Sequence, residues 1–159
     1  IGMDFGFTHD PTAMIKCGIY NDSLYMDELC YKTHLLTSEI IAELKQYKLH
    51  IYPDSADPRL IQEISNAGLI IYPIQKAQGS IMAGLTKMME FKLRITRRSI
   101  NLIKEFKNYT YLQNKDGKWL NQPIDAYNHG IDAVRYYVLG MLLGKILKPK
   151  KIPEHLNIW

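Results

Sequence analysis

The order of strand-like and helix-like segments constrains the fold more than any other feature of this 159-residue chain. Residues 3–7 alternate apolar and polar side chains as a strand does, and strand-like segments follow at 12–20 and 24–34. Between the last two, Asn21-Asp22-Ser23 is typical of a tight turn. The first third of the chain is therefore predicted to form a meander of three antiparallel strands.

Helix-like and strand-like segments alternate after this meander. Thr37 or Ser38 is expected to cap one helix, and Asp57 followed by Pro58 a second. The run Leu69–Tyr72 is apolar on both faces, as in a buried parallel strand. Further helices are expected at 80–91, at 99–107 and from about Asp125, short strands at 50–52 and 93–96, and a hairpin of 109–112 with 119–120. This order predicts an α/β fold whose mixed sheet continues from three antiparallel strands into parallel strands, with helices on both faces.

The length of the chain suits one domain with a core of its own. We expect that domain to span residues 1–148 and to be followed by an irregular tail at 149–159. Because the chain opens directly on a strand at Ile1, a domain cut from a longer protein is favoured. No apolar run reaches the roughly 20 residues that span a bilayer. Two cysteines are too few for a disulfide framework, so reduced thiols are expected.

Three aspartates stand at positions that indicate chemistry. Asp4 lies inside the first strand, where a buried carboxylate is costly unless it is paired or binds a cation. Asp54 follows a strand at its carboxyl end, where open α/β sheets bind ligands, and Asp132 lies in the last helix. Carboxylates suit hard cations such as Mg²⁺ or Mn²⁺. Two such ions, roughly 3.5–4 Å apart, can hydrolyse a phosphodiester bond, so the three residues are predicted to form a catalytic metal site.

Other polar residues near these aspartates have two interpretations each. The spacing of Asp125, Asn128, His129 and Asp132 places all four on one face of a helix. His129 either orients a water, Asp132 or a phosphate, or satisfies a helix end. Asp125 is either a helix cap or a fourth carboxylate of the site. Asp57 either supports the metal ligands or, in front of Pro58, caps a helix.

The charge pattern says more than the formal net charge of +4. Residues 87–107 hold seven basic and two acidic side chains, and residues 145–155 hold four basic and one acidic, so the rest of the chain is acidic. Basic patches beside carboxylates suit a bound polyanion, although a run of charge is more often a solvated face. The candidate DNA-binding residues are Lys76, Arg94, Arg97, Arg98, Lys148, Lys150 and Lys151.

The chain resembles the C-terminal nuclease domain of tailed-phage large terminase subunits, a ribonuclease-H-like family. The segments that carry the resemblance lie between about Ile1 and Gly140, and they are Gly2–Phe7, Asp10–Ala13, Pro53–Pro58, Lys76–Ile81 and Asn128–Tyr136. Relatives often carry glutamate at the position of Asp57. The first motif alone is weak, whereas the ordered set is specific.

The resemblance implies a metal-dependent endonuclease that cuts concatemeric double-stranded DNA during viral genome packaging. By this resemblance Asp4 touches both of two divalent cations, Mg²⁺ or Mn²⁺, while Asp54 and Asp132 each complete one. The expected partners are an N-terminal ATPase domain that this chain lacks, the small terminase subunit and the portal. The expected location is the cytoplasm of an infected or prophage-carrying bacterium, away from the membrane.

Other classes of protein share parts of this pattern. Asp4, Gly6 and Thr8 fit the phosphate loop of sugar kinases and actin-like ATPases, but those proteins resemble two such domains and this chain is too short. Gly79 and Gly84 have P-loop spacing, but Leu85-Thr86 stands where Lys-Ser/Thr is required, so ATP hydrolysis is not expected. The remaining alternatives are another ribonuclease-H-like nuclease, such as a Holliday-junction resolvase, and a non-catalytic DNA-binding or docking module.

Overall fold

A five-stranded mixed sheet forms the centre of the computed structural model, which describes residues 1–142. The strands are β1 (Gly2–Asp4), β2 (Thr12–Tyr20), β3 (Ser23–Lys32), β4 (Tyr52–Pro53) and β5 (Lys92–Ile95), in the order β4-β1-β2-β3-β5. β2 pairs antiparallel with both β1 and β3, whereas β4 runs parallel to β1 and β5 parallel to β3. The predicted mixed sheet is therefore confirmed.

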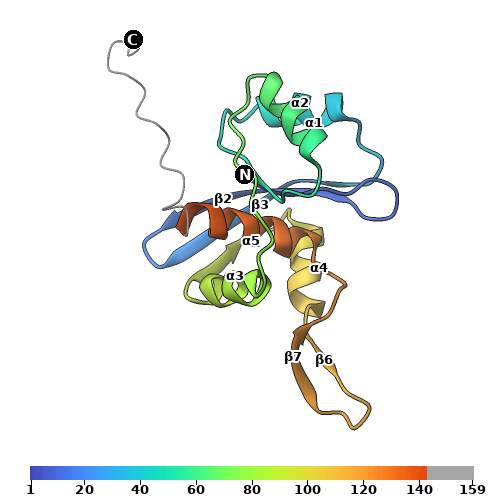
Figure 1. Ribbon diagram of the computed structural model, residues 1–159. Coiled ribbons are helices and arrows are strands. Elements are labelled where there is room, and N and C mark those ends of the chain that lie inside the picture. The colour runs from blue at the N-terminus through green and yellow to red at the C-terminus, as the bar shows by residue number, and fades with distance from the viewer. Residues whose placement is uncertain (143–159) are drawn as a thin grey trace.

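Helices cover both faces of this sheet, as predicted (Figure 1). α1 (Thr37–Lys45) and α2 (Pro58–Asn66) lie on one face, and α3 (Ser80–Met89), α4 (Ile100–Asn108) and α5 (His129–Leu142) lie on the other. Under α1 and α2 the core joins Met3 and Met14 of the sheet to Ile40, Leu44 and Ile64. Each fully buried side chain of this size contributes about 1.5–3 kcal/mol relative to exposure.

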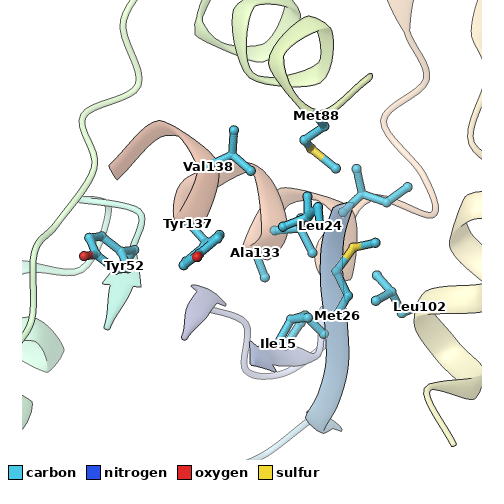
Figure 2. Packing of buried hydrophobic residues seen from close by; sticks show 12 residues of the cluster. Ile15, Leu24, Met26, Tyr52, Met88, Leu102, Ala133, Tyr137 and Val138 are labelled. Atoms are coloured by element: carbon cyan, nitrogen blue, oxygen red, sulfur yellow. The ribbon is translucent and has the colours of Figure 1, made fainter. Parts of the chain in front are cut away.

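The second core fixes α5 against the strands (Figure 2). Ala133, Val134, Tyr137 and Val138 of α5 pack with residues of β2 and β3, among them Ile15, Leu24 and Met26. The backbone of α5 also lies directly against the backbone of β1. A Cβ atom at Gly2 would collide with the Ala133 carbonyl. Because Gly2 has no side chain, the N-terminal half of α5 can lie next to Asp4.

Three local expectations are corrected. Residues 69–72 do not form a regular strand, and their one bridge is an isolated parallel one, Ile71 with Ile51. Pro73, which cannot donate to a strand ladder, separates it from a second isolated bridge, Ile74 with Asp54. The last helix begins at His129 rather than near Asp125, because Tyr127 has φ +56°, which helical backbone does not adopt. α1 begins after Leu36, whose N–H donates to Glu39, and not after a Thr37 or Ser38 cap.

A second, two-stranded sheet extends from the body of the domain (Figure 1). It consists of β6 (Tyr111–Gln113) and β7 (Trp119–Pro123), which pair antiparallel as the sequence predicted. The expected domain boundary at 148 and the tail at 149–159 lie outside the described residues. Within residues 1–142, no helix combines the length and apolarity needed to cross a membrane.

Candidate metal centre

The three predicted aspartates meet where β1, β4 and α5 converge. Asp4 ends β1 and is 8% exposed, and Asp54 directly follows β4 and is 3% exposed. Since Met3 pairs with Pro53 in parallel, the two carboxylates lie one residue beyond paired positions of neighbouring strands. Asp132 lies in the first turn of α5, the helix that packs against β1.

The electrostatics of Asp4 reflect this crowding. Burial raises the pKa of the Asp4 carboxyl, and the charges of Asp132 and Asp54 raise it further, while a hydrogen bond to His129 opposes the shift. Crowded carboxylates in a buried place are typical of functional sites, because a bound cation relieves their repulsion.

Each of these carboxylates is paired with a basic side chain. His129 Nδ1 lies 3.1 Å from Asp4 Oδ2, and its Nε2 lies 3.5 Å from Asp10 Oδ1. The other two pairs are Lys76 Nζ with Asp54 Oδ2 at 2.9 Å, and Arg135 with both oxygens of Asp132 at 3.0 and 2.9 Å. Lys76 and Arg135 therefore neutralise Asp54 and Asp132, and His129 does the same for Asp4 when its ring is protonated.

The donor chemistry of this cluster fits a hard divalent cation, since all three side chains offer carboxylate oxygens. Among residues 1–142, no group of three or more His, Cys, Asp or Glu side chains is arranged so that it could hold a metal ion as it stands. In this arrangement Asp54 is paired with Lys76 and Asp132 with Arg135. A metal ion at Asp54 would take the place of the Lys76 ammonium.

Arg135 and Tyr136, for which the sequence predicted no role, lie beside the carboxylates. Arg135 is 1% exposed, and its guanidinium lies 4.6 Å from the centre of the Tyr136 ring. Within the described part of the chain, Arg135 Nη1 and the Tyr136 hydroxyl are buried without a hydrogen-bond partner. The spacing of Arg135 three residues after Asp132 was the available signal, because residues i and i+3 face each other on a helix.

The supporting residues are arranged differently from the prediction. Asp125 and Asn128 precede α5 instead of sharing its face with His129 and Asp132, and Asn128 Nδ2 donates to Asp125 Oδ1 at 3.2 Å. Asp57 accepts from the Leu60 N–H at 3.1 Å, so the helix-cap interpretation describes its contact.

The predicted DNA-binding residues fall into separate places. Lys76 lies at the carboxylates, whereas Arg98 pairs through two nitrogens with Asp27 of β3. Arg94 lines an open groove with Asp27, and Arg97 is exposed in the turn after β5. Lys148, Lys150 and Lys151 lie outside the described residues. The role of all these residues in DNA binding stays a prediction.

Sheet order, helix placement and the acidic cluster define an α/β domain of the ribonuclease-H-like class. The crystal structure of the g2p large-terminase nuclease domain from bacteriophage SPP1 with bound Mn is similar, with a TM-score of 0.76 and 26% identity over 85% of this chain and 81% of that one. The P22 large terminase nuclease domain shares the fold, with a TM-score of 0.66 and 17% identity over 89% of this chain and 78% of that one.

The family model described as the terminase RNase-H-like domain matches residues 4–139, and the chain belongs to this family. It is 30% identical over 144 residues to the terminase large subunit of Bacillus phage SPP1, covering 85% of this chain and 34% of the relative. It is 26% identical over 141 residues to the PBSX phage terminase large subunit of Bacillus subtilis, covering 85% and 33%. The chain thus spans about a third of these relatives, and the resemblance seen in the sequence is confirmed.

Proposed function

We propose that this chain is a metal-dependent endonuclease domain that hydrolyses phosphodiester bonds of concatemeric double-stranded DNA during phage genome packaging. The observation that carries the proposal is the position of Asp4, whose pKa is raised by burial and by the charges of Asp132 and Asp54. The similar SPP1 g2p nuclease domain has been solved with bound Mn, which supports binding of a divalent cation by this chain.

Asp4, Asp54 and Asp132 are the proposed catalytic metal ligands, for two divalent cations, Mg²⁺ or Mn²⁺. Such ions supply Lewis acidity for attack on phosphorus and for departure of the leaving oxygen. The chain contributes the rest of the site: His129 holds Asp4, Arg135 holds Asp132, and Lys76 lies where it can meet a phosphate once it leaves Asp54. The exposed Arg94, Arg97 and Arg98 are proposed to contact the DNA backbone, with little sequence preference.

The wider setting is part of the same proposal. A large terminase from a thermophilic bacteriophage has been solved in complex with ADP, and this chain covers only 39% of it at 20% identity, which supports a separate ATPase domain in the full protein. A domain spanning 1–148, the small terminase subunit and the portal as partners, and the cytoplasm of the bacterial host as location complete the proposal.

Plasmid cleavage tests the proposal. The 159-residue chain is incubated with supercoiled DNA in Mn²⁺, Mg²⁺ or EDTA, next to Asp4→Asn, Asp54→Asn and Asp132→Asn. Loss of a ligand is expected to slow cleavage by more than the roughly 10–100-fold that loss of a residue supporting a ligand costs. Asp22→Asn is the matched control, because Asp22 pairs with Lys92 at the turn before β3. Cleavage in EDTA, or wild-type rates in both Asp4→Asn and Asp132→Asn, would contradict the proposal, and a preference for four-way junctions would indicate a resolvase.

A further inference from the structure

Two carboxylates outside the acidic cluster accept hydrogen bonds from the first turn of a helix that lies far from them in the sequence. Glu28 of β3 accepts hydrogen bonds from the Leu102 N–H at 2.9 Å and from Asn101 Nδ2 at 2.7 Å, in the first turn of α4. Glu105, further along α4, accepts from the Ile131 N–H at 2.9 Å in the first turn of α5. β3 therefore anchors α4, and α4 anchors the helix that carries Asp132.

Glu105 is built into this position. It is 2% exposed, and its other oxygen accepts a 2.7 Å hydrogen bond from the Tyr31 hydroxyl. Burial and the neighbouring Glu105 raise the pKa of Tyr31, so that hydroxyl remains a donor. A buried carboxylate is costly unless its oxygens are satisfied, and here a phenol and a helix N-terminus satisfy them.

The start of α5 depends on this distant acceptor. Asn128, which precedes the helix, directs its side-chain amide at Asp125. Gly130 lets the carboxylate come close, because a Cβ atom there would lie 2.9 Å from Glu105 Oε2 and 2.9 Å from Leu102 Cδ1. Glu105 thus takes the part that a local capping side chain plays at other helices.

Strand pairing and hydrogen bonds connect Glu105 to Asp4 from two sides, through the sheet and through α5. Strand pairing places Asp4 opposite Ala13, and Ala13 opposite Tyr31. Tyr31 donates to Glu105, Glu105 accepts from Ile131, and His129, two residues before Ile131, returns to Asp4 at 3.1 Å. Glu105 therefore links the first turn of α5, which carries Asp132, to Tyr31 of β3, in the same sheet as Asp4.

We propose that Glu105 is a positioning residue of the metal centre, which holds the first turn of α5 so that Asp132 and His129 face Asp4. The proposal rests on the proposed metal-dependent function, because positioning matters only if the carboxylates share a cation. Residues that orient metal ligands typically change metal affinity by about 10–100-fold when they are mutated.

The test compares Glu105→Ala, Glu105→Gln and Gly130→Ala with Glu39→Ala. Glu39 is the matched control, since its carboxylate accepts from the Leu36 N–H at the start of α1, on the opposite face of the sheet. The readouts are hydrogen exchange of the Ile131 amide without metal, the Mn²⁺ dissociation constant, and the plasmid cleavage rate at saturating Mn²⁺.

Glu105→Ala is expected to speed Ile131 exchange about tenfold or more and to weaken Mn²⁺ binding by about 10–100-fold. Glu105→Gln keeps an acceptor and should recover much of both losses, Gly130→Ala should show smaller losses of the same kind, and Glu39→Ala should show neither. Wild-type Ile131 exchange and Mn²⁺ affinity in Glu105→Ala would overturn the proposal. If Glu105→Ala does not fold, wild-type values of both quantities in Gly130→Ala would overturn it. If the wild-type chain neither binds Mn²⁺ nor cuts DNA, the proposed function is wrong, and so is this role for Glu105. If the wild-type chain is active and the variants bind Mn²⁺ and cut DNA equally well, only the positioning role is wrong.

Discussion

The Lys76 ammonium lies 2.9 Å from Asp54 Oδ2, so a cation supplied by the chain already neutralises one of the three clustered carboxylates. The Lys76 side chain is 53% exposed, whereas that of Asp54 is 4% exposed. The lysine can therefore leave toward solvent while the buried aspartate stays in place. The other oxygen, Asp54 Oδ1, accepts from the Ala56 N–H at 2.7 Å, so a metal ion at Asp54 would compete with Lys76 for Oδ2.

Replacement of Lys76 by alanine is expected to tighten Mn²⁺ binding to the DNA-free protein by about three- to tenfold, because the metal no longer displaces an ammonium group worth on the order of 1 kcal/mol. Calorimetric titration measures the change. Lys87→Ala, which removes a lysine paired with the exposed Glu90 on α3, should leave the affinity unaltered. Weaker Mn²⁺ binding in Lys76→Ala would show that the lysine supports the metal site instead of competing with it.

The pKa of His129 should depend on the charge of Asp4. The hydrogen bond to Asp4 raises the pKa of His129 above its ordinary value of 6.5. The charged imidazole therefore stabilises the metal-free fold below pH 6.5, and this contribution is lost as the pH rises through the raised pKa. NMR titration of the ring should give a lower midpoint in Asp4→Asn and on addition of Mg²⁺, and an unaltered one in Asp22→Asn. Equal midpoints in the wild type and Asp4→Asn would refute this coupling.

The sequence allowed prediction of the elements whose signals are local. β2 was expected at 12–20 and lies at Thr12–Tyr20, and Asp57 with Pro58 marked the start of α2. The structure of residues 69–74 was harder to predict, because an apolar run indicates burial but not whether the backbone amides pair with a neighbouring strand. Here Pro73 interrupts the pairing, and only isolated bridges form. The start of α5 was missed because left-handed backbone at Tyr127, a residue that rarely adopts it, leaves no compositional signal.

The residues of the candidate site also differ in whether a local signal in the sequence made them predictable. Asp4, Asp54 and Asp132 were predictable because each stands at a costly or ligand-facing place in its own element. Glu105 was not, because its partners, Tyr31 and Ile131, are 74 and 26 residues away in the sequence. Only the packing of α4 between β3 and α5 brings such groups together.

Arg98→Gln should lower the free energy of unfolding only slightly at pH 7, because the arginine side chain is largely exposed. Its hydrogen bonds lower the pKa of Asp27 to about 2. A lowered carboxyl pKa stabilises the fold above the ordinary value of 3.8, and the contribution disappears as the pH falls through about 2. Urea denaturation between about pH 7 and pH 3 should show the two proteins converging in acid. A difference that does not vary with pH would contradict this assignment.

Gly84 of α3 is expected to control the ion pair at Asp132, because a Cβ atom at this position would collide with Cγ and Cδ of the buried Arg135. Alanine is favoured over glycine in helices by about 1 kcal/mol, whereas overpacking of a core costs about 1–3 kcal/mol. Gly84→Ala should therefore destabilise the protein by up to about 2 kcal/mol in urea denaturation. It should also weaken Mn²⁺ binding, because Arg135 would turn Asp132 as it moves. Gly18→Ala, where a Cβ atom would meet nothing within 4 Å, is the matched control. A Gly84→Ala protein as stable as wild type, with the same Mn²⁺ affinity, would show that Arg135 moves without disturbing Asp132.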